Sequence, residues 1–523
     1  MTDWLRKIAN TPITWMFIPS LMVALPMLFF GNPGFYGDDL HFFQGIDKVG
    51  TWGYIWGWMS NYGAVYRPVG ITVETLLYVI FGGRSFLIYW VSMMIYIGAV
   101  CILFSQLWQL TRNLFVSAFV AMFFALFPFN STAFLQLSSM YMVVACLLTI
   151  QMIGVVAQTR GVLNVGQTFA WGVAWLLLLL TYEQIAGLVS VICLLLFLVN
   201  VREGFQVACQ RPLAPCISLC LVTILFMVMY MITPNNPKIV SLKTINQKDS
   251  EVMTKSFSKN EQESDQIINA VSVAVDNSSM KSVGRYSAIL SRVSKVFGFF
   301  IDGVGYGWSS LMQQGALGMV AVFTILFAAT LVFFIPITPL DRGLASVFIL
   351  LGFVWSLSTI APFLLYKAVH IPPYTLLLPG IGVGVMVIGF LGMICPAKNI
   401  RVRATVLKSS FVSIMLIFSL LQYGYFFGLR EELSYWQLMS KRVEPILSVV
   451  GKGHIVQVEG IPKKYNNHIF WLEKAVGIRY FLTLLGEKGY GLDIHTNHNM
   501  RLIRISLKDS SGSIQKFNFN SMQ

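Results

Sequence analysis

Charged side chains are scarce in this sequence, and that scarcity excludes a soluble globular protein. Only 11% of the 523 residues are Asp, Glu, Lys or Arg, whereas soluble domains carry about 25%. Hydrophobic residues make up 56% of the chain, and the mean hydropathy is +0.68. We therefore expect an integral membrane protein and not a soluble enzyme with an added anchor.

Several other features are missing. The sequence has no glycine-rich phosphate loop, no Cys/His cluster with metal-ligand spacing, no nucleophile elbow and no internal repeat. Acidic residues are the minority, 23 against 37 basic residues. The excess of positive charge is typical of cytoplasmic loops in membrane proteins, so it does not indicate nucleic-acid binding. No disulfide framework is expected, because the cysteines all fall in predicted spans or cytoplasmic segments: 101, 146, 193, 209, 216, 220 and 395.

Long apolar runs of roughly 17–25 residues are present, and such runs are typical of membrane-spanning helices. They predict an all-α polytopic membrane protein with about 11 transmembrane helices. The predicted spans are 12–30, 86–108, 113–129, 135–157, 168–182, 185–200, 213–232, 316–336, 343–366, 374–394 and 406–427.

The distribution of Lys and Arg predicts the orientation of these spans. With the N-terminus in the cytoplasm, the short inside loops hold Arg112, Arg160 and Arg342, while the short outside loops hold only Lys367. The first external loop is then 31–85 and the large external loop is 233–315. That second loop is basic but exceeds the roughly 60 residues over which the rule applies.

The chain is expected to consist of two parts. Residues 1–427 form the transmembrane domain, and residues 428–523 form a small external α+β domain. In this tail "YWQLMSKRVEPILSVV" is helix-like, and "HIVQVEG" and "MRLIRISLK" are strand-like.

Ionisable residues from distant parts of the sequence gather on the predicted external side. Such convergence in a helical bundle indicates a functional site, although each carboxylate taken alone could simply be solvated. The residues are Asp38, Asp39, Glu74, Glu183, Lys367 and His370. The adjacent pair Asp38 and Asp39 could also include a helix N-cap, which would need only one of them.

The rest of the first external loop contains aromatic residues and an arginine. Trp52 and Trp56 lie one helical turn apart, a spacing that fits either an interfacial aromatic belt or rings that stack on sugars. Arg67 offers a permanently charged fork suited to phosphate or carboxylate. Pro68 is expected to begin a helix that contains Glu74 and is too short to cross the membrane.

Taken in order, these segments resemble the GT-C superfamily of multi-span glycosyltransferases that use lipid-phosphate-linked sugars. The matching features are the acidic pair in "YGDDLHFFQ", the aromatic loop, "YRP", a short apolar helix and "FGG" before the second span. "LLTYEQ" at 179–184 and "PPYTLLLPGIGVG" at 372–384 are similar to later parts of that pattern. Residues 12–110 carry most of the resemblance, and the large loop and tail show none.

The resemblance implies roles for residues of this chain. Asp38 or Asp39 would activate the acceptor hydroxyl, and both are candidate ligands of a divalent cation, Mg²⁺ or Mn²⁺. Arg67, Lys367 and His370 would stabilise the donor phosphate as the leaving group gains charge. Candidates for contacts with the acceptor or sugar are His41, Trp52, Trp56, Tyr66, Glu74 and Glu183.

The resulting expectation is an inverting hexosyltransferase of the bacterial inner membrane, with a periplasmic active site and a periplasmic C-terminal domain. It would move a hexose, with glucose as the candidate, from a polyprenyl-phosphate carrier to a periplasmic glycan such as lipopolysaccharide O-antigen, as serotype-converting glucosyltransferases do. Two alternatives remain open. An O-antigen polymerase or ligase would favour external loops dominated by Arg, and a lipid-linked sugar transporter or flippase would place charges at mid-membrane.

Overall fold

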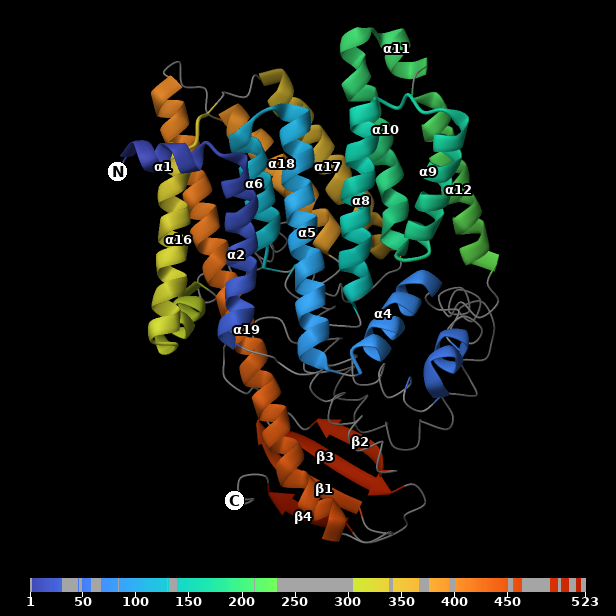
Figure 1. The fold of residues 1–523 in the computed structure, drawn as a ribbon. Coiled ribbons are helices and arrows are strands. Elements are labelled where there is room, and N and C mark those ends of the chain that lie inside the picture. Colours follow the sequence, from blue (N-terminus) through green and yellow to red (C-terminus); the bar gives the residue numbers. More distant parts are fainter. Residues whose placement is uncertain are drawn as a thin grey trace, which may run out of the picture.

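The computed structural model describes most of the helical part of the chain and four strands near its C-terminus (Figure 1). The described residues are 2–30, 46, 49–57, 67–82, 84–128, 130, 139–210, 212–232, 304–337, 342–365, 376–394, 400–449, 455–462, 490–496, 500–507 and 514–518.

Helices dominate the N-terminal half. They are α1 (Thr2–Ala9), α2 (Pro12–Phe30), α4 (Pro68–Ile80), α5 (Ser85–Thr111), α6 (Leu114–Leu126), α8 (Met140–Thr159), α9 (Val165–Leu179), α10 (Leu188–Asn200), α11 (Phe205–Gln210) and α12 (Leu213–Ile232). Two short 3-10 turns, η2 (Glu183–Gly187) and η3 (Val201–Glu203), precede and follow α10. The C-terminal half adds α16 (Ala316–Phe334), α17 (Arg342–Leu365), α18 (Leu377–Ile394) and α19 (Ile400–Val449).

Six helices in the described residues are long and apolar enough to cross a membrane, or seven if the bent pair α1 and α2 forms one span. Shorter apolar helices, including α6, α9 and α12, stand beside them. A helix therefore lies at each position where the sequence predicts a span, and the protein is a mainly helical, membrane-embedded one. The count of eleven spans and their orientation stay predictions.

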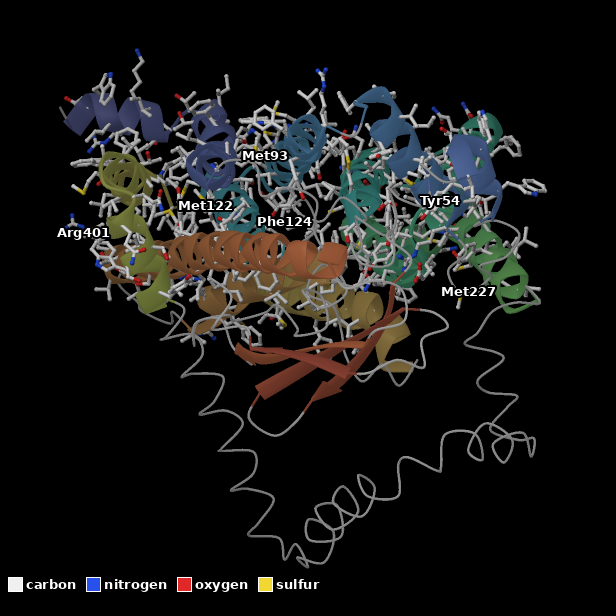
Figure 2. The ribbon with its side chains drawn as sticks, turned by 90° about the horizontal axis from the view of Figure 1, so that it is seen from below. Tyr54, Met93, Met122, Phe124, Met227 and Arg401 are labelled. Carbon is white, nitrogen blue, oxygen red and sulfur yellow. The ribbon has the colours of Figure 1, made fainter. Side chains whose placement is uncertain are left out.

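The helices stand side by side as a bundle (Figure 1). One end of the bundle carries α4 and η2, and we call it the α4 end. The opposite end carries α1 and α11. Seen along the bundle, Met93, Met122 and Phe124 lie inside the layer of helices (Figure 2), where each is at most 1% exposed.

Close packing fixes α17 against α18. A Cβ atom added to Gly352 would lie 2.4 Å from the Gly382 carbonyl oxygen, and one added to Gly389 would lie 2.8 Å from the Ala345 carbonyl oxygen. Only glycine allows such backbone contact, which is a common way to pack helices in a membrane. The two helices are therefore antiparallel, with the C-terminal half of α17 beside the N-terminal half of α18.

The last helix, α19, has 50 residues. At 1.5 Å per residue it is about 75 Å long, far more than the roughly 30 Å of a bilayer core. The boundary expected at residue 427 lies inside this helix, because residues 429–444, "LREELSYWQLMSKRVE", contain no Gly or Pro and continue it with good helix formers. The predicted tail helix is thus an extension of the last predicted span.

A four-stranded sheet follows α19. Its strands are β1 (Ile455–Pro462), β2 (Tyr490–Thr496), β3 (Met500–Leu507) and β4 (Ile514–Asn518), in the order β2-β3-β1-β4. β3 is antiparallel to both β1 and β2, and β4 is parallel to β1. Strands β1 and β3 coincide with the two strand-like stretches of the tail, and the sheet lies at the α4 end of the bundle (Figure 1). The external location of this part stays a prediction.

Candidate functional site

Arg67 is the N-cap residue of α4, and its side chain lies on the face that α4 turns toward the bundle. Pro68 occupies the first helical position, where its missing N–H costs nothing. Gly70, Ile71 and Glu74 are buried on the same face, three, four and seven residues after Arg67. The sequence prediction of a short helix that begins at Pro68 is confirmed.

The turn between α9 and η2 holds α4 in place. The backbone N–H of Val69 donates to the carbonyl of Leu180 at 3.3 Å. A Cβ atom at Gly70 would lie 2.9 Å from the Thr181 carbonyl oxygen, so this glycine permits the close approach of the two segments. Glu183 lies two residues after Thr181, so this packing brings Glu183 to the start of α4.

Arg67 and Glu183 form a two-pronged ion pair across 116 sequence positions. Nε of Arg67 donates to Oε2 of Glu183, and Nη2 donates to Oε1, both at 2.5 Å. The two side chains are only 15% and 9% exposed. This planar fork-to-carboxylate geometry is the strongest form of charge-assisted hydrogen bonding between side chains.

Two tyrosines complete the surroundings of the guanidinium, and we call the four residues the Arg67 cluster: Arg67, Tyr141, Tyr182 and Glu183. Nη1 of Arg67 donates to the hydroxyl of Tyr141. The Cζ atom of Arg67 lies 5.1 Å from the ring centre of Tyr141 and 4.9 Å from that of Tyr182. Cation–ring attraction strengthens when the charge is removed from water, as it is here.

The electrostatics of the cluster keep Arg67 charged. Burial by itself lowers the pKa of Arg67, but the neighbouring Glu183 charge and the two tyrosines outweigh it, so the pKa lies well above its ordinary value. Because Glu183 supplies a matching negative charge, the pair as a whole is neutral. The cluster therefore holds a permanent cation in a fixed plane without a large net charge.

The other predicted site residues in the described part of the chain differ in their exposure to solvent. Glu74 is buried, with 4% exposure, two turns along α4 from Arg67. Trp52 and Trp56 lie on a helical stretch, residues 49–57, and are 75% and 69% exposed, in keeping with either a membrane-interface role or contact with sugar. The predicted residues Asp38, Asp39, His41, Tyr66, Lys367 and His370 lie outside the described residues.

α17, the helix before the segment that contains Lys367 and His370, contacts η2, the turn that begins with Glu183. A Cβ atom at Gly187 of η2 would lie 2.0 Å from the carbonyl oxygen of Ser358, so η2 touches α17 directly. Seven residues further on, about 10 Å along the helix, α17 ends at Leu365, just before the segment that contains Lys367 and His370. The contact with η2 therefore lies in the C-terminal part of α17, seven residues before the helix ends.

Tyr141 and Tyr182 did not emerge from the sequence as site residues. Tyr182 directly precedes Glu183 in "LLTYEQ", which offered a signal. Tyr141 stands at the beginning of a span on the same predicted side as Arg67, a position where an aromatic residue is ordinarily assigned to the membrane interface. Only the fold identifies its contact with Arg67.

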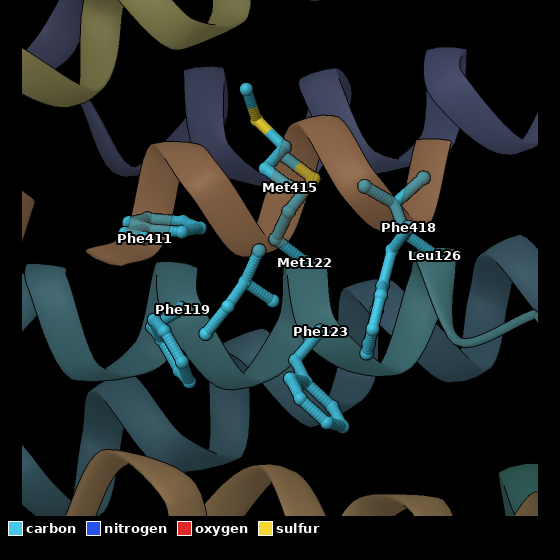
Figure 3. Close-up of a pocket in the computed structure, with 8 residues that line it drawn as sticks. Phe119, Met122, Phe123, Leu126, Phe411, Met415 and Phe418 are labelled. Atoms are coloured by element: carbon cyan, nitrogen blue, oxygen red, sulfur yellow. The ribbon is translucent and has the colours of Figure 1, made fainter. Parts of the chain in front are cut away.

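A narrow apolar crevice lies elsewhere, between α6 and α19 (Figure 3). Its walls are the side chains of Phe119, Met122, Phe123, Leu126, Phe411, Ile414, Met415 and Phe418. These side chains provide no group that could bind phosphate or activate a hydroxyl. The crevice is therefore a feature of helix packing and does not belong to the candidate site.

Within the part of the chain that the structure describes, no group of three or more His, Cys, Asp or Glu side chains could hold a metal ion. The proposed cation ligands Asp38 and Asp39 are not among these residues. No family model matches the chain, and no curated protein matches it either.

Proposed function

We propose that this protein is an inverting glycosyltransferase that moves a hexose from a polyprenyl-phosphate carrier to a periplasmic glycan such as lipopolysaccharide O-antigen. The observation that carries the proposal is the buried pairing of Arg67 with Glu183 at the α4 end. Residues far apart in the sequence and expected on one membrane face meet there, next to the turn η2, which contacts the C-terminal part of α17.

Such a reaction needs one group that takes the proton of the acceptor hydroxyl and others that stabilise the donor phosphate. Asp38 or Asp39 would accept the proton of the acceptor hydroxyl as its oxygen bonds to the anomeric carbon. The bond between that carbon and the phosphate oxygen breaks at the same time, and direct displacement inverts the anomeric centre. The lipid phosphate leaves with the bonding electron pair, and Arg67, Lys367 and His370 would stabilise its growing negative charge.

A divalent cation, Mg²⁺ or Mn²⁺, would bind at Asp38 and Asp39 if the reaction requires one, and would supply further stabilisation of negative charge. The steps above need none, since proton removal and phosphate stabilisation both have a residue of this chain assigned to them. We propose the inner membrane of a bacterium as the location, with the α4 end and the C-terminal sheet in the periplasm.

Transfer of label tests the proposal. Purified protein is mixed with radiolabelled polyprenyl-phosphate hexose and a periplasmic glycan, and incorporation of label into the glycan is measured. We expect label to move, and Asp38→Asn or Asp39→Asn to stop transfer without loss of folded protein. Movement of labelled lipid across vesicle membranes without a new glycosidic bond would instead support a transporter, and elongation of the glycan by whole repeats would support a polymerase.

A further inference from the structure

We propose that Glu183 and Tyr141 are positioning residues that aim Arg67 at the donor phosphate, and that the charge of Glu183 makes the site prefer a phosphate with one negative charge to a diphosphate. This inference rests on the proposed function and gives Glu183 a role different from the sugar contact expected from the sequence.

The donor groups of Arg67 are the first reason. A guanidinium has five N–H groups. In the described part of the chain, two of them donate to Glu183 and one to Tyr141. No contact among the described residues uses the second N–H of Nη1 or the second N–H of Nη2, so these two groups can donate to another acceptor. A tetrahedral phosphate has several oxygens that can accept from N–H groups of this kind.

The number of contacts that hold the guanidinium is the second reason. Glu183 binds Nε and Nη2 of Arg67, and Tyr141 binds Nη1. The rings of Tyr141 and Tyr182 lie 5.1 Å and 4.9 Å from the Cζ atom of Arg67. A long Arg side chain normally loses rotamer freedom when it binds a ligand. Here the protein has already restricted it, so less entropy is lost when the phosphate arrives.

The charge of the pair is the third reason. Glu183 offsets the charge of Arg67 at 2.5 Å. A phosphate diester, as in a polyprenyl-phosphate sugar, brings one negative charge, and a diphosphate brings two. The second negative charge would meet the carboxylate of Glu183 in a poorly hydrated place, where like charges repel strongly. An unpaired Arg67 would favour the diphosphate instead.

Direct binding measurements separate this inference from the proposed function. Radiolabelled polyprenyl-phosphate hexose and polyprenyl-diphosphate hexose are each bound to the purified protein in detergent, and donor KM and kcat are measured in parallel. In Glu183→Gln, we expect the ratio of the diphosphate Kd to the monophosphate Kd to fall about tenfold, which corresponds to about 1.4 kcal/mol. Glu183→Asp keeps the charge and should keep the ratio.

Tyr141→Phe keeps the ion pair but removes one acceptor from Arg67. Arg67 thereby loses one charge-assisted hydrogen bond that helps to hold its plane, so the donor KM should rise by roughly two- to tenfold while the binding ratio stays unchanged. If Glu183→Gln cannot be purified folded, this variant still tests the positioning role. The matched control is Glu203→Gln, which breaks the exposed Arg160–Glu203 pair and should change neither quantity.

The outcomes are distinguishable. If wild-type protein transfers label but Glu183→Gln leaves the binding ratio unchanged, or Tyr141→Phe leaves the donor KM unchanged, the positioning inference is wrong and the proposed function stands. If wild-type protein neither binds the monophosphate lipid nor transfers its sugar, both are wrong.

Discussion

Removal of the Glu183 charge should destabilise the protein more than any comparable change at its surface. In Glu183→Gln the guanidinium of Arg67 stays buried beside its two tyrosines, but the carboxylate that balances it at 2.5 Å is gone. Breaking a buried pair by removal of one partner costs about 3–5 kcal/mol. The retained amide oxygen can still accept one hydrogen bond. We therefore expect Glu183→Gln to lower the free energy of unfolding by about 3 kcal/mol, the lower end of that range.

A double-mutant cycle isolates the interaction itself. Arg67→Gln, Glu183→Gln and the double variant are unfolded by titration with SDS in mixed micelles and followed by tryptophan fluorescence. The double variant should lose less stability than the two single variants added together, with a coupling energy of about 2–3 kcal/mol.

The Arg160–Glu203 pair provides a matched comparison, because it joins the same residue types but its side chains are 53% and 33% exposed. Solvent screening limits such a pair to about 0–1 kcal/mol. A coupling energy at Arg67–Glu183 below about 0.5 kcal/mol, or equal to that of the exposed pair, would refute the description of the cluster as a buried ion pair.

Two further predictions concern the same region. Gly70→Ala places a methyl group 2.9 Å from the Thr181 carbonyl oxygen and should lower the free energy of unfolding by about 1–3 kcal/mol, whereas Gly57→Ala meets no atom within 4 Å and should be nearly neutral in the same SDS titration. Arg67→Ala should raise the donor KM more than Trp56→Ala, because a charge-assisted phosphate contact outweighs one exposed ring; equal KM values would contradict the assignment of Arg67 to the donor.

Much of the helical architecture follows from the sequence because its cause is local. Apolar runs predict the positions of α2 and α5, and Pro68 predicts the beginning of α4. The strand patterns of β1 and β3 are equally local. The continuity of α19 was harder to predict, since hydropathy ends the span near residue 427 whereas helix propensity does not end there.

The sequence predicted Arg67 and Glu183 as residues of the candidate site, but it did not predict the contacts between them. Positive-inside counting places Arg67 and Glu183 near the same face, which the fold supports by joining them directly. The pairing depends on how the α9–η2 turn packs against Gly70, and no short sequence pattern encodes that packing. Tyr141 was missed for the same reason, because a tyrosine at a span end has many possible neighbours.

The orientation of the α4 end is the point on which the proposed function depends, and cysteine labelling measures it directly. Arg84 is exposed at the beginning of α5, at the α4 end, whereas the native Cys209 is exposed on α11 at the opposite end. Intact spheroplasts are treated with a membrane-impermeant maleimide, before and after lysis. We expect Arg84→Cys to react in intact spheroplasts and Cys209 only after lysis. Reaction of Cys209 in intact spheroplasts, with Arg84→Cys protected until lysis, would place the Arg67 cluster in the cytoplasm and contradict a periplasmic glycosyltransferase.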